Sequence, residues 1–130
     1  MPEQNRLLHS DHSVPFRRIL GATSLTKDAV RNRVGDDLGS LKEIMIDIPA
    51  GRVAYAVLSF GGFLGVGNKL FAIPWEMLTV DEDRQCLLLD VDKATLDNAP
   101  GFDKDHWPDM SDPAWGAQLH TYYGRQPYWQ

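Results

Sequence analysis

The sequence lacks the features that mark disulfide-bonded, membrane-spanning or cysteine-rich zinc proteins. It contains one cysteine, Cys86, which excludes an intramolecular disulfide and a cysteine-rich zinc site. No apolar run is long enough to span a bilayer, and residues 1–18 lack the apolar core of a signal peptide. We therefore expect a cytoplasmic protein without membrane insertion. Three leucines follow Cys86, and no His or Lys lies nearby in the sequence to lower the pKa of its thiol. We therefore expect Cys86 to be buried as a small apolar residue.

Positive charge is scarce outside the N-terminal quarter of the chain. The 130 residues carry 13 Lys and Arg against 18 Asp and Glu, a net charge of −5. Residues 1–33 hold six basic and three acidic side chains (+3), whereas residues 34–130 hold seven and fifteen (−8). Because nucleic-acid surfaces need clustered positive charge, the acidic body disfavours a nucleic-acid partner. The basic N-terminal arm keeps open an RNA-associated role.

Complete nucleotide-binding motifs are also missing, although Gly61, Gly62, Gly65 and Gly67 form a glycine-rich loop. A phosphate-binding P-loop requires G-x-x-x-x-G-K-[ST], but Asn68 stands where the lysine belongs and no metal-binding hydroxyl follows. The next segment, KLFAIP, is typical of a strand, whereas a P-loop opens a helix. We therefore interpret the glycines as a β-hairpin corner and expect no cofactor.

No constellation of catalytic or metal-binding residues stands out. His9 and His12 lie in a polar segment without a third ligand at a suitable spacing, which disfavours a metal site. The acidic segment 103–109 lacks the glycine that a calcium-binding loop requires. The pair Asp90 and Asp92 has no neighbouring base in the sequence. We therefore predict no catalytic residue, no metal and no enzyme activity.

Short apolar segments separated by turn residues predict an all-β fold. RILGA (18–22) is expected to be a strand, and Gly35 lies in a tight turn between two further strands. Residues 41–48 alternate with one slip, which indicates a bulge and places Leu41, Ile44, Ile46 and Ile48 on one face. The segments expected after these are a central strand apolar on both faces (52–60), a strand ending at Pro74, a hairpin with an acidic tip (81–84) and a short helix (93–102).

The C-terminal quarter predicts one helix. Ser111 or Asp112 can cap it, Pro113 suits its first turn, and Gly124 follows its end. The helical spacing of three apolar residues predicts a stripe that packs on the barrel, made of Trp115, Leu119 and Tyr122.

Two groups of apolar side chains are candidates for an interaction surface. Phe63, Leu64 and Val66 belong to the glycine-rich loop, and an apolar loop is either tucked in or used as an interface. Tyr128 and Trp129 lie at the end of the chain, where they are hard to bury unless a partner covers them.

The stretch GRVAYAVLSFGGFLGVGNKLFAIPWEML (51–78) resembles the signature of the PRC-barrel family. VRNRVGDDLGSLKEIMID (30–47) and LLLDVDKATLDNAPGFD (87–103) are also similar to the family pattern, so the resemblance extends over about residues 18–105. The family is named for the cytoplasmic domain of the photosynthetic reaction-centre H subunit and also occurs in a ribosome maturation factor. This chain is more similar to the stand-alone, H-subunit-like branch, because it has no room for the factor's second barrel.

The resemblance implies a small β-barrel that serves as a docking or assembly module and has no catalytic residues. It also implies that Tyr55, Pro74 and Trp75 are core or corner residues. Together with the four loop glycines, they form the structural motif of the family pattern.

These patterns predict a flexible arm (1–16), a PRC-barrel-like domain (17–105) and a C-terminal loop, helix and tail (106–130). A small barrel with exposed apolar edges gains from covering them. The leading hypothesis is therefore a non-enzymatic protein-interaction module that forms a homodimer or higher homo-oligomer. The alternative is a ribosome- or RNA-associated assembly factor. The sequence does not identify a protein partner.

Overall fold

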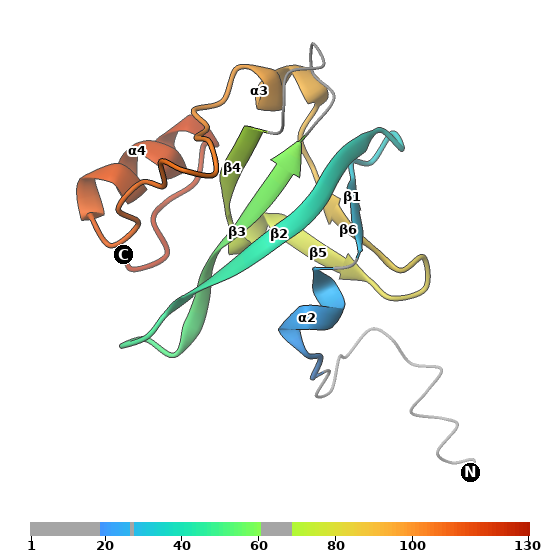
Figure 1. The fold of residues 1–130 in the computed structure, drawn as a ribbon, viewed down its shortest axis with the longest axis horizontal. Helices are drawn as coiled ribbons and strands as arrows, with labels where there is room; N and C mark the ends of the chain where they lie inside the picture. The colour runs from blue at the N-terminus through green and yellow to red at the C-terminus, as the bar shows by residue number, and fades with distance from the viewer. Residues whose placement is uncertain (1–18, 27, 61–68) are drawn as a thin grey trace.

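The computed structural model describes residues 19–26, 28–60 and 69–130, and within them the chain forms one curled, six-stranded sheet (Figure 1). The strand order is β4-β3-β2-β1-β6-β5, and the sheet curls into a half-barrel. This architecture, with a short C-terminal helix, confirms the expected all-β fold class. The strands are β1 (Ala29–Arg31), β2 (Asp37–Asp47), β3 (Arg52–Phe60), β4 (Lys69–Pro74), β5 (Leu78–Asp81) and β6 (Cys86–Leu89). The helical elements are α2 (Ala22–Leu25), η1 (Trp75–Met77), α3 (Lys93–Asp97) and α4 (Pro113–Tyr122).

The curl of the sheet follows from one short connection. β4 and β5 lie at opposite ends of the strand order, yet only the three residues of η1 separate them in sequence. A flat six-stranded sheet is about 24 Å wide, whereas the connection from Pro74 to Leu78 spans at most about 14 Å. The two sheet edges must therefore approach each other at η1. Pro74 ends β4, as expected for a residue that cannot donate to a strand ladder.

The pairing of the strands confirms most of the expected hairpins. β1 pairs antiparallel with β2, β2 with β3, β3 with β4, and β5 with β6. One pairing joins distant segments, because β1 lies parallel to β6 with Ala29 opposite Cys86 and Val30 opposite Leu87. Cys86 is buried as a free thiol in this pairing, which confirms its expected apolar role.

Strand β2 is irregular at two places. Its register against β3 shifts between Leu41 and Glu43 and again between Met45 and Ile46, so the expected bulge is confirmed and a second irregularity follows it. Ile46 is 55% exposed and Ile48 is 77% exposed. Of the four residues expected on one apolar face, only Leu41 and Ile44 therefore pack in the core. Ile46 and Ile48 are uncovered at the end of the β2–β3 hairpin.

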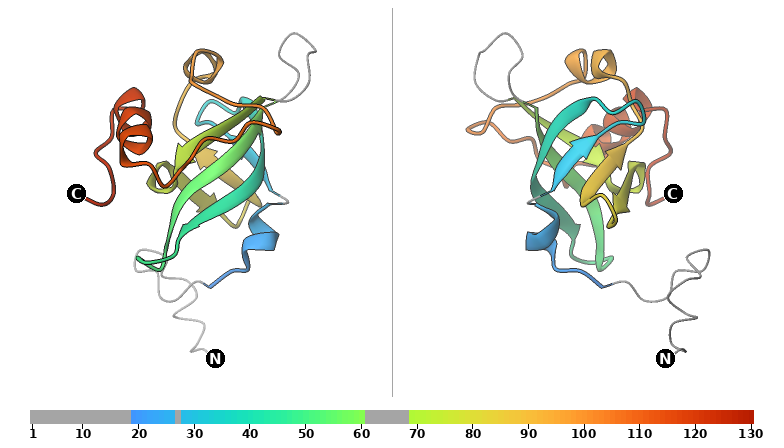
Figure 2. Two further views of the ribbon diagram at one scale, coloured as in Figure 1. Left: turned by 60° about the vertical axis from the view of Figure 1, so that its left-hand side comes forward. Right: turned by 90° about the vertical axis from the view of Figure 1, so that its right-hand side faces the viewer.

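Both faces of the sheet carry apolar clusters. The larger cluster contains fully buried side chains from several strands, among them Leu38, Leu58, Phe71, Ile73, Leu87 and Leu89. A second cluster joins Tyr55 and Ala72 of the sheet to Leu119 of α4. Figure 2 shows α4 beside the face of β3 and β4. Because β3 contributes to both clusters, its expected position as a strand covered on both faces is confirmed.

The prediction of a strand at RILGA is wrong for its described residues, 19–22. Ile19 and Leu20 are exposed and irregular, and Ala22 begins helix α2. The Gly21 carbonyl accepts a backbone hydrogen bond from the Ser24 N–H, so it bonds within its own helical turn and not to a neighbouring strand. No helix in the described ranges is both long enough and apolar enough to cross a membrane.

Candidate functional site

Helix α4 positions the C-terminal extension, residues 106–130. The Asp112 carboxylate accepts a hydrogen bond from the Ala114 N–H at 2.9 Å, and Pro113 occupies the first turn. Gly124 has a φ of 70°, which ends the helix as expected. The Arg125 N–H then donates to the His120 carbonyl at 2.8 Å. The chain thereby reverses and brings the last residues back onto α4.

The buried face of α4 differs from the expected stripe. Leu119 is buried and Trp115 is half-buried, as expected, but Tyr122 is exposed. Gly116 and His120 are buried in its place. The face is rotated relative to the prediction because the returning tail, and not only the sheet, covers the helix. Sequence reasoning missed Gly116 and His120, although their separation of four residues places them on one side of a helix.

Gly116 allows the tail to lie directly on α4. A Cβ at this position would approach the Trp129 ring to 2.6 Å and the Tyr55 hydroxyl to 2.8 Å. The Trp129 ring also packs edge-on against His120, with 5.5 Å between ring centroids. The absence of a side chain at Gly116 is therefore what permits this close approach.

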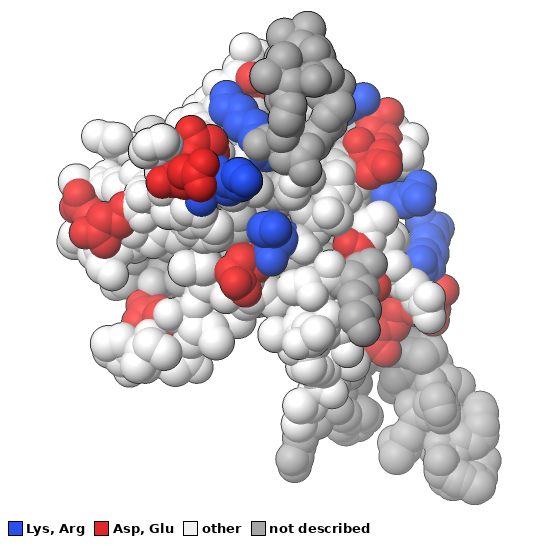
Figure 3. Space-filling view, viewed as in Figure 1, with Lys and Arg blue, Asp and Glu red and all other residues white. Residues whose placement is uncertain are grey.

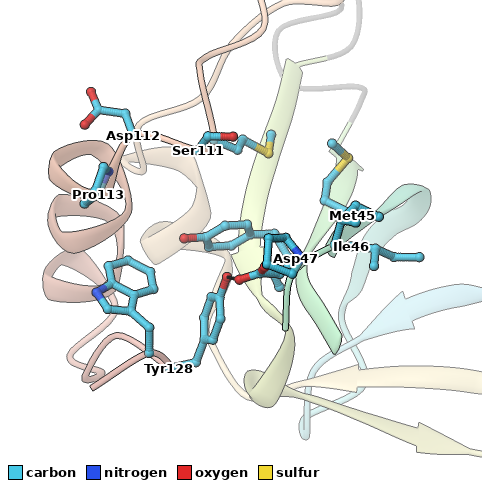
Figure 4. A pocket seen from close by; sticks show the side chains of 13 residues that line it. Met45, Ile46, Asp47, Ser111, Asp112, Pro113 and Tyr128 are labelled. Atoms are coloured by element: carbon cyan, nitrogen blue, oxygen red, sulfur yellow. Dashed lines mark hydrogen bonds between the residues drawn. The ribbon is translucent and has the colours of Figure 1, made fainter. Parts of the chain in front are cut away.

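Tyr128 connects the tail to the β2–β3 hairpin. Its hydroxyl donates a hydrogen bond to Asp47 Oδ2 at 2.5 Å, and Figure 4 shows the two side chains facing each other. The Arg52 guanidinium lies over the Tyr128 ring, 4.4 Å from its centroid. Tyr128 thus has partners within the chain and needs no other molecule to cover it. Trp129 remains 45% exposed.

A groove of about 510 Å³ lies between the end of the β2–β3 hairpin and the C-terminal extension, and we call it the hairpin groove (Figure 4). Its walls combine apolar side chains with a few polar groups, a composition common in binding sites. The hairpin contributes Met45, Ile46, Asp47, Ile48, Pro49, Ala54 and Tyr55, and the extension contributes Met110, Ser111, Asp112, Pro113, Tyr128 and Trp129.

The polar groups of the hairpin groove have shifted pKa values. The hydrogen bond from Tyr128, together with one from the Ala50 N–H, lowers the pKa of Asp47 below its ordinary value. Burial, followed by the bond to Asp47, raises the pKa of Tyr128 to about 12. Burial also raises the pKa of Tyr55 to about 12. At neutral pH Asp47 is therefore ionised and Tyr128 is protonated, which are the states that their hydrogen bond requires.

Removing the Tyr128 hydroxyl is expected to raise the pKa of Asp47 towards its ordinary value of 3.8. The shift at Asp47 is downward, so the bond's contribution is present above pH 3.8 and is lost as the pH falls through the lower folded-state value. Carboxyl-carbon NMR of Asp47 during acid titration measures this pKa in the protein and in Tyr128→Phe. Tyr122→Phe is the control, because its hydroxyl donates to the Thr95 carbonyl. An unchanged Asp47 pKa in Tyr128→Phe would contradict the assignment of this bond.

The structure brings together only part of the predicted interaction surface. Tyr128 and Trp129 both line the hairpin groove. Phe63, Leu64 and Val66 lie outside the described residues. The same holds for the loop glycines Gly61, Gly62, Gly65 and Gly67.

The remaining residues of the expected motif occupy structural positions. Tyr55 is buried against α4, Pro74 is buried at the end of β4, and Trp75 packs against the larger cluster. Sequence reasoning missed Ile46 and Ile48 as surface residues. The sequence does contain a signal for their exposure. The alternation of apolar residues continues up to the turn Pro-Ala-Gly, and a strand that runs this far extends beyond the edge of a small core.

The acidic loop after α3 contains one close pair of side chains. His106 Nδ1 lies 2.8 Å from Asp103 Oδ1 in an exposed pair, and this contact lowers the pKa of Asp103. Among residues 19–26, 28–60 and 69–130, no group of three or more His, Cys, Asp or Glu side chains is arranged to hold a metal ion. His9 and His12 lie outside these ranges.

Comparison with known proteins identifies the family. A family model described as the PRC-barrel domain matches residues 18–96, which are 79 of the 130 residues. No curated protein showed a significant match. The matched segment includes all six described strands and ends within α3, before the C-terminal extension that forms one wall of the hairpin groove. Because the family model matches more than half of the chain, the chain belongs to the PRC-barrel domain family.

Proposed function

We propose that this chain is a non-enzymatic protein-interaction module that self-associates through the hairpin groove. The observation that carries the proposal is the exposure of Ile46 and Ile48 beside a groove with apolar walls. Water-exposed isoleucines next to a concave apolar surface are typical of a docking site. PRC-barrel domains are generally non-catalytic binding or assembly modules, which supports this class of function.

A second copy of the chain fits the shape of this surface. Ile48, beside the hairpin turn, is 77% exposed, and the hairpin groove that it lines is also lined by Met45 and Met110. A two-fold interface uses the same patch on both subunits, so the Ile48 of each copy enters the groove of the other. Methionine side chains adapt readily to an inserted group. Each buried isoleucine contributes about 2 kcal/mol to association.

The two carboxylates at the groove are already engaged within the chain, and the Tyr55 hydroxyl is buried without a hydrogen-bond partner among the described residues. Asp47 accepts from Tyr128, and Asp112 caps α4. Apolar side chains therefore provide the remaining driving force. Because screening weakens charge pairs but not apolar contacts, self-association is expected to persist at about 1 M NaCl.

Ile48→Asp is expected to weaken self-association about thirtyfold or more, because a carboxylate replaces an apolar side chain at the interface. Sedimentation equilibrium over a range of protein concentrations measures the dissociation constant. Val34→Asp is the matched control, since Val34 is 81% exposed in the β1–β2 turn and does not line the groove. A monomeric wild-type protein, or equal weakening by the two substitutions, would refute the proposed interface.

We propose that a second contribution to docking comes from the glycine-loop residues Phe63, Leu64 and Val66. The cytoplasmic location is a prediction from the sequence. The RNA-associated alternative rests on the basic N-terminal arm. Capture of the tagged full chain from lysate, with and without ribonuclease, separates the two functions. Recovery of ribosomal proteins only without ribonuclease would favour the alternative.

A further inference from the structure

A second, smaller hollow lies at β1 and β6 and is lined by three arginines. Figures 1 and 2 show β1 and β6 away from α4, which lies beside β3 and β4. This hollow has a volume of about 320 Å³ and we call it the arginine pocket. It does not overlap the hairpin groove. Its lining residues are Arg31, Asn32, Arg33, Gly35, Arg84, Cys86 and Leu88.

The backbone that carries two of these arginines is fixed by the buried residue between them. The Asn32 side-chain amide donates to the Val91 carbonyl and to Asp36 Oδ2, both at 3.1 Å, and its oxygen accepts from the Asp36 N–H at 2.8 Å. These bonds join the β1–β2 turn to the segment after β6. Arg31, at the end of β1, and Arg33, in the turn, are therefore carried by backbone of defined shape next to β6.

The third arginine comes from a different turn. Arg84 lies between β5 and β6, next to Gln85, whose φ of 53° reverses the chain. The pairing of β1 with β6 brings this turn and the end of β1 to the same hollow. Residues separated by about fifty positions thus supply guanidinium groups to one site, which makes the arrangement a product of the fold and not of a local basic run.

The arginines have little to occupy them within the chain. Arg33 pairs with Asp90 at 3.1 Å and Arg84 with Asp81 at 3.7 Å, and both arginine side chains are exposed. The Arg33–Asp90 pair is exposed on both sides and therefore contributes only about 0–1 kcal/mol, so a better acceptor displaces it at little cost. The Asp81 side chain is only 19% exposed, but its 3.7 Å separation from Arg84 is long for an ion pair. Within the described part of the chain, the Arg31 side chain makes no hydrogen bond or ion pair.

We propose that the arginine pocket binds a compact oxyanion, namely the phosphoryl group of a small phosphate ester or of inorganic phosphate. Planar guanidinium groups match the oxygens of a phosphoryl group and bind them through paired, charge-assisted hydrogen bonds. The lining contains three cationic side chains and no carboxylate. The pocket volume lies at the lower end of the range for small-molecule sites, which suits a small ligand.

The surroundings of the pocket select against a long polyanion. Figure 3 shows basic groups flanked by acidic groups along the right-hand side of the view. Asp81 and Asp90 pair with two of the arginines, while Asp36 lies in the β1–β2 turn and Asp37 begins β2. A nucleic-acid strand would extend across these carboxylates, whereas a single phosphoryl group contacts only the arginines. The site therefore differs from the RNA surface of the alternative function.

Titration of the full chain with inorganic phosphate and, separately, with glycerol 3-phosphate tests the proposal. The arginine Nε–H resonances are followed by NMR at an ionic strength held constant with NaCl. We expect saturable shifts for Arg31, Arg33 and Arg84. Arg31→Gln is expected to weaken binding about tenfold, the loss of one charge-assisted contact. The probe that binds more tightly shows whether the ester or free phosphate is the natural source of the group.

Arg125→Gln is the matched control, because it removes the same charge from an exposed site in the C-terminal extension. Arg33→Gln provides a second test if Arg31→Gln alters the amide spectrum. Shifts that do not saturate, or equal weakening by Arg125→Gln, would show general charge screening and overturn the proposal. Competition by a single-stranded RNA oligomer as effective as phosphate would overturn the selectivity for a compact anion.

Discussion

Gly39→Ala is expected to lower the free energy of unfolding of the protein by about 4 kcal/mol. Gly39 lies in β2 with a φ of 109°, a conformation that residues with a Cβ rarely adopt. A Cβ there would lie 2.1 Å from the Ser59 carbonyl oxygen and 3.0 Å from its carbon. These are backbone atoms, so β2 and β3 would have to separate. Backbone strain accounts for about 1–3 kcal/mol, and displacement of the strand adds the remainder.

Urea unfolding of the full chain measures this loss. Gly35→Ala is the matched control, because Gly35 also has a positive φ, 90°, but a Cβ there would meet no atom within 4 Å. Gly35→Ala is therefore expected to cost only the conformational strain, about 1–2 kcal/mol. The difference in the free energy of unfolding between the two variants measures the cost of a side chain where β2 closely approaches β3. Equal losses would contradict the packing described for Gly39.

Gly116→Val is expected to detach the C-terminal tail from α4 while the sheet stays folded. The added side chain would occupy the position of the Trp129 ring and press on the Tyr55 hydroxyl. Valine has a slightly higher helix propensity than glycine, so the loss cannot come from the helix itself. We expect the docked state of the tail to be destabilised by about 2 kcal/mol, which raises the population of the detached state about thirtyfold.

Trypsin cleavage after Arg125 reports the detached state, because release of residues 126–130 requires this segment to leave the protein surface. Mass spectrometry follows the rate at which the peptide appears. Ala114→Val is the control, since it places the same side chain on an exposed position of α4. If Gly116→Val is cleaved no faster than Ala114→Val, the tail does not depend on Gly116 for docking.

The sheet was predictable because its signals are local. A turn at Gly35, a strand that ends at Pro74 and an acidic hairpin tip at 81–84 each depend on a few neighbouring residues. The segment RILGA misled for the opposite reason. Its apolar residues suit a strand, but a strand forms only where another strand pairs with it. In this region β2 and β6 both pair with β1, which follows RILGA in the sequence.

The hairpin groove was only partly predictable. Tyr128 and Trp129 were identified as interface candidates because terminal aromatics are hard to bury. Their contacts with Asp47 and Gly116 join positions 81 and 13 residues apart, and no local pattern indicates such a pairing. The exposure of Ile46 also depends on the second register shift in β2, which is set by the partner strand. The composition of the site was therefore accessible from the sequence, but its assembly was not.

The parallel pairing of β1 with β6 has a consequence for the order in which the chain folds. Ala29 and Cys86 are 57 positions apart, whereas the hairpins β2–β3 and β5–β6 close over short turns. Contacts of large sequence separation carry the highest loop-closure entropy, so we expect this pairing to form late and to slow the overall rate. Val30 and Leu87, both fully buried, enter the larger cluster only when this late pairing forms. The thiol of Cys86 is shielded by the same event, so its protection marks the completion of the native state.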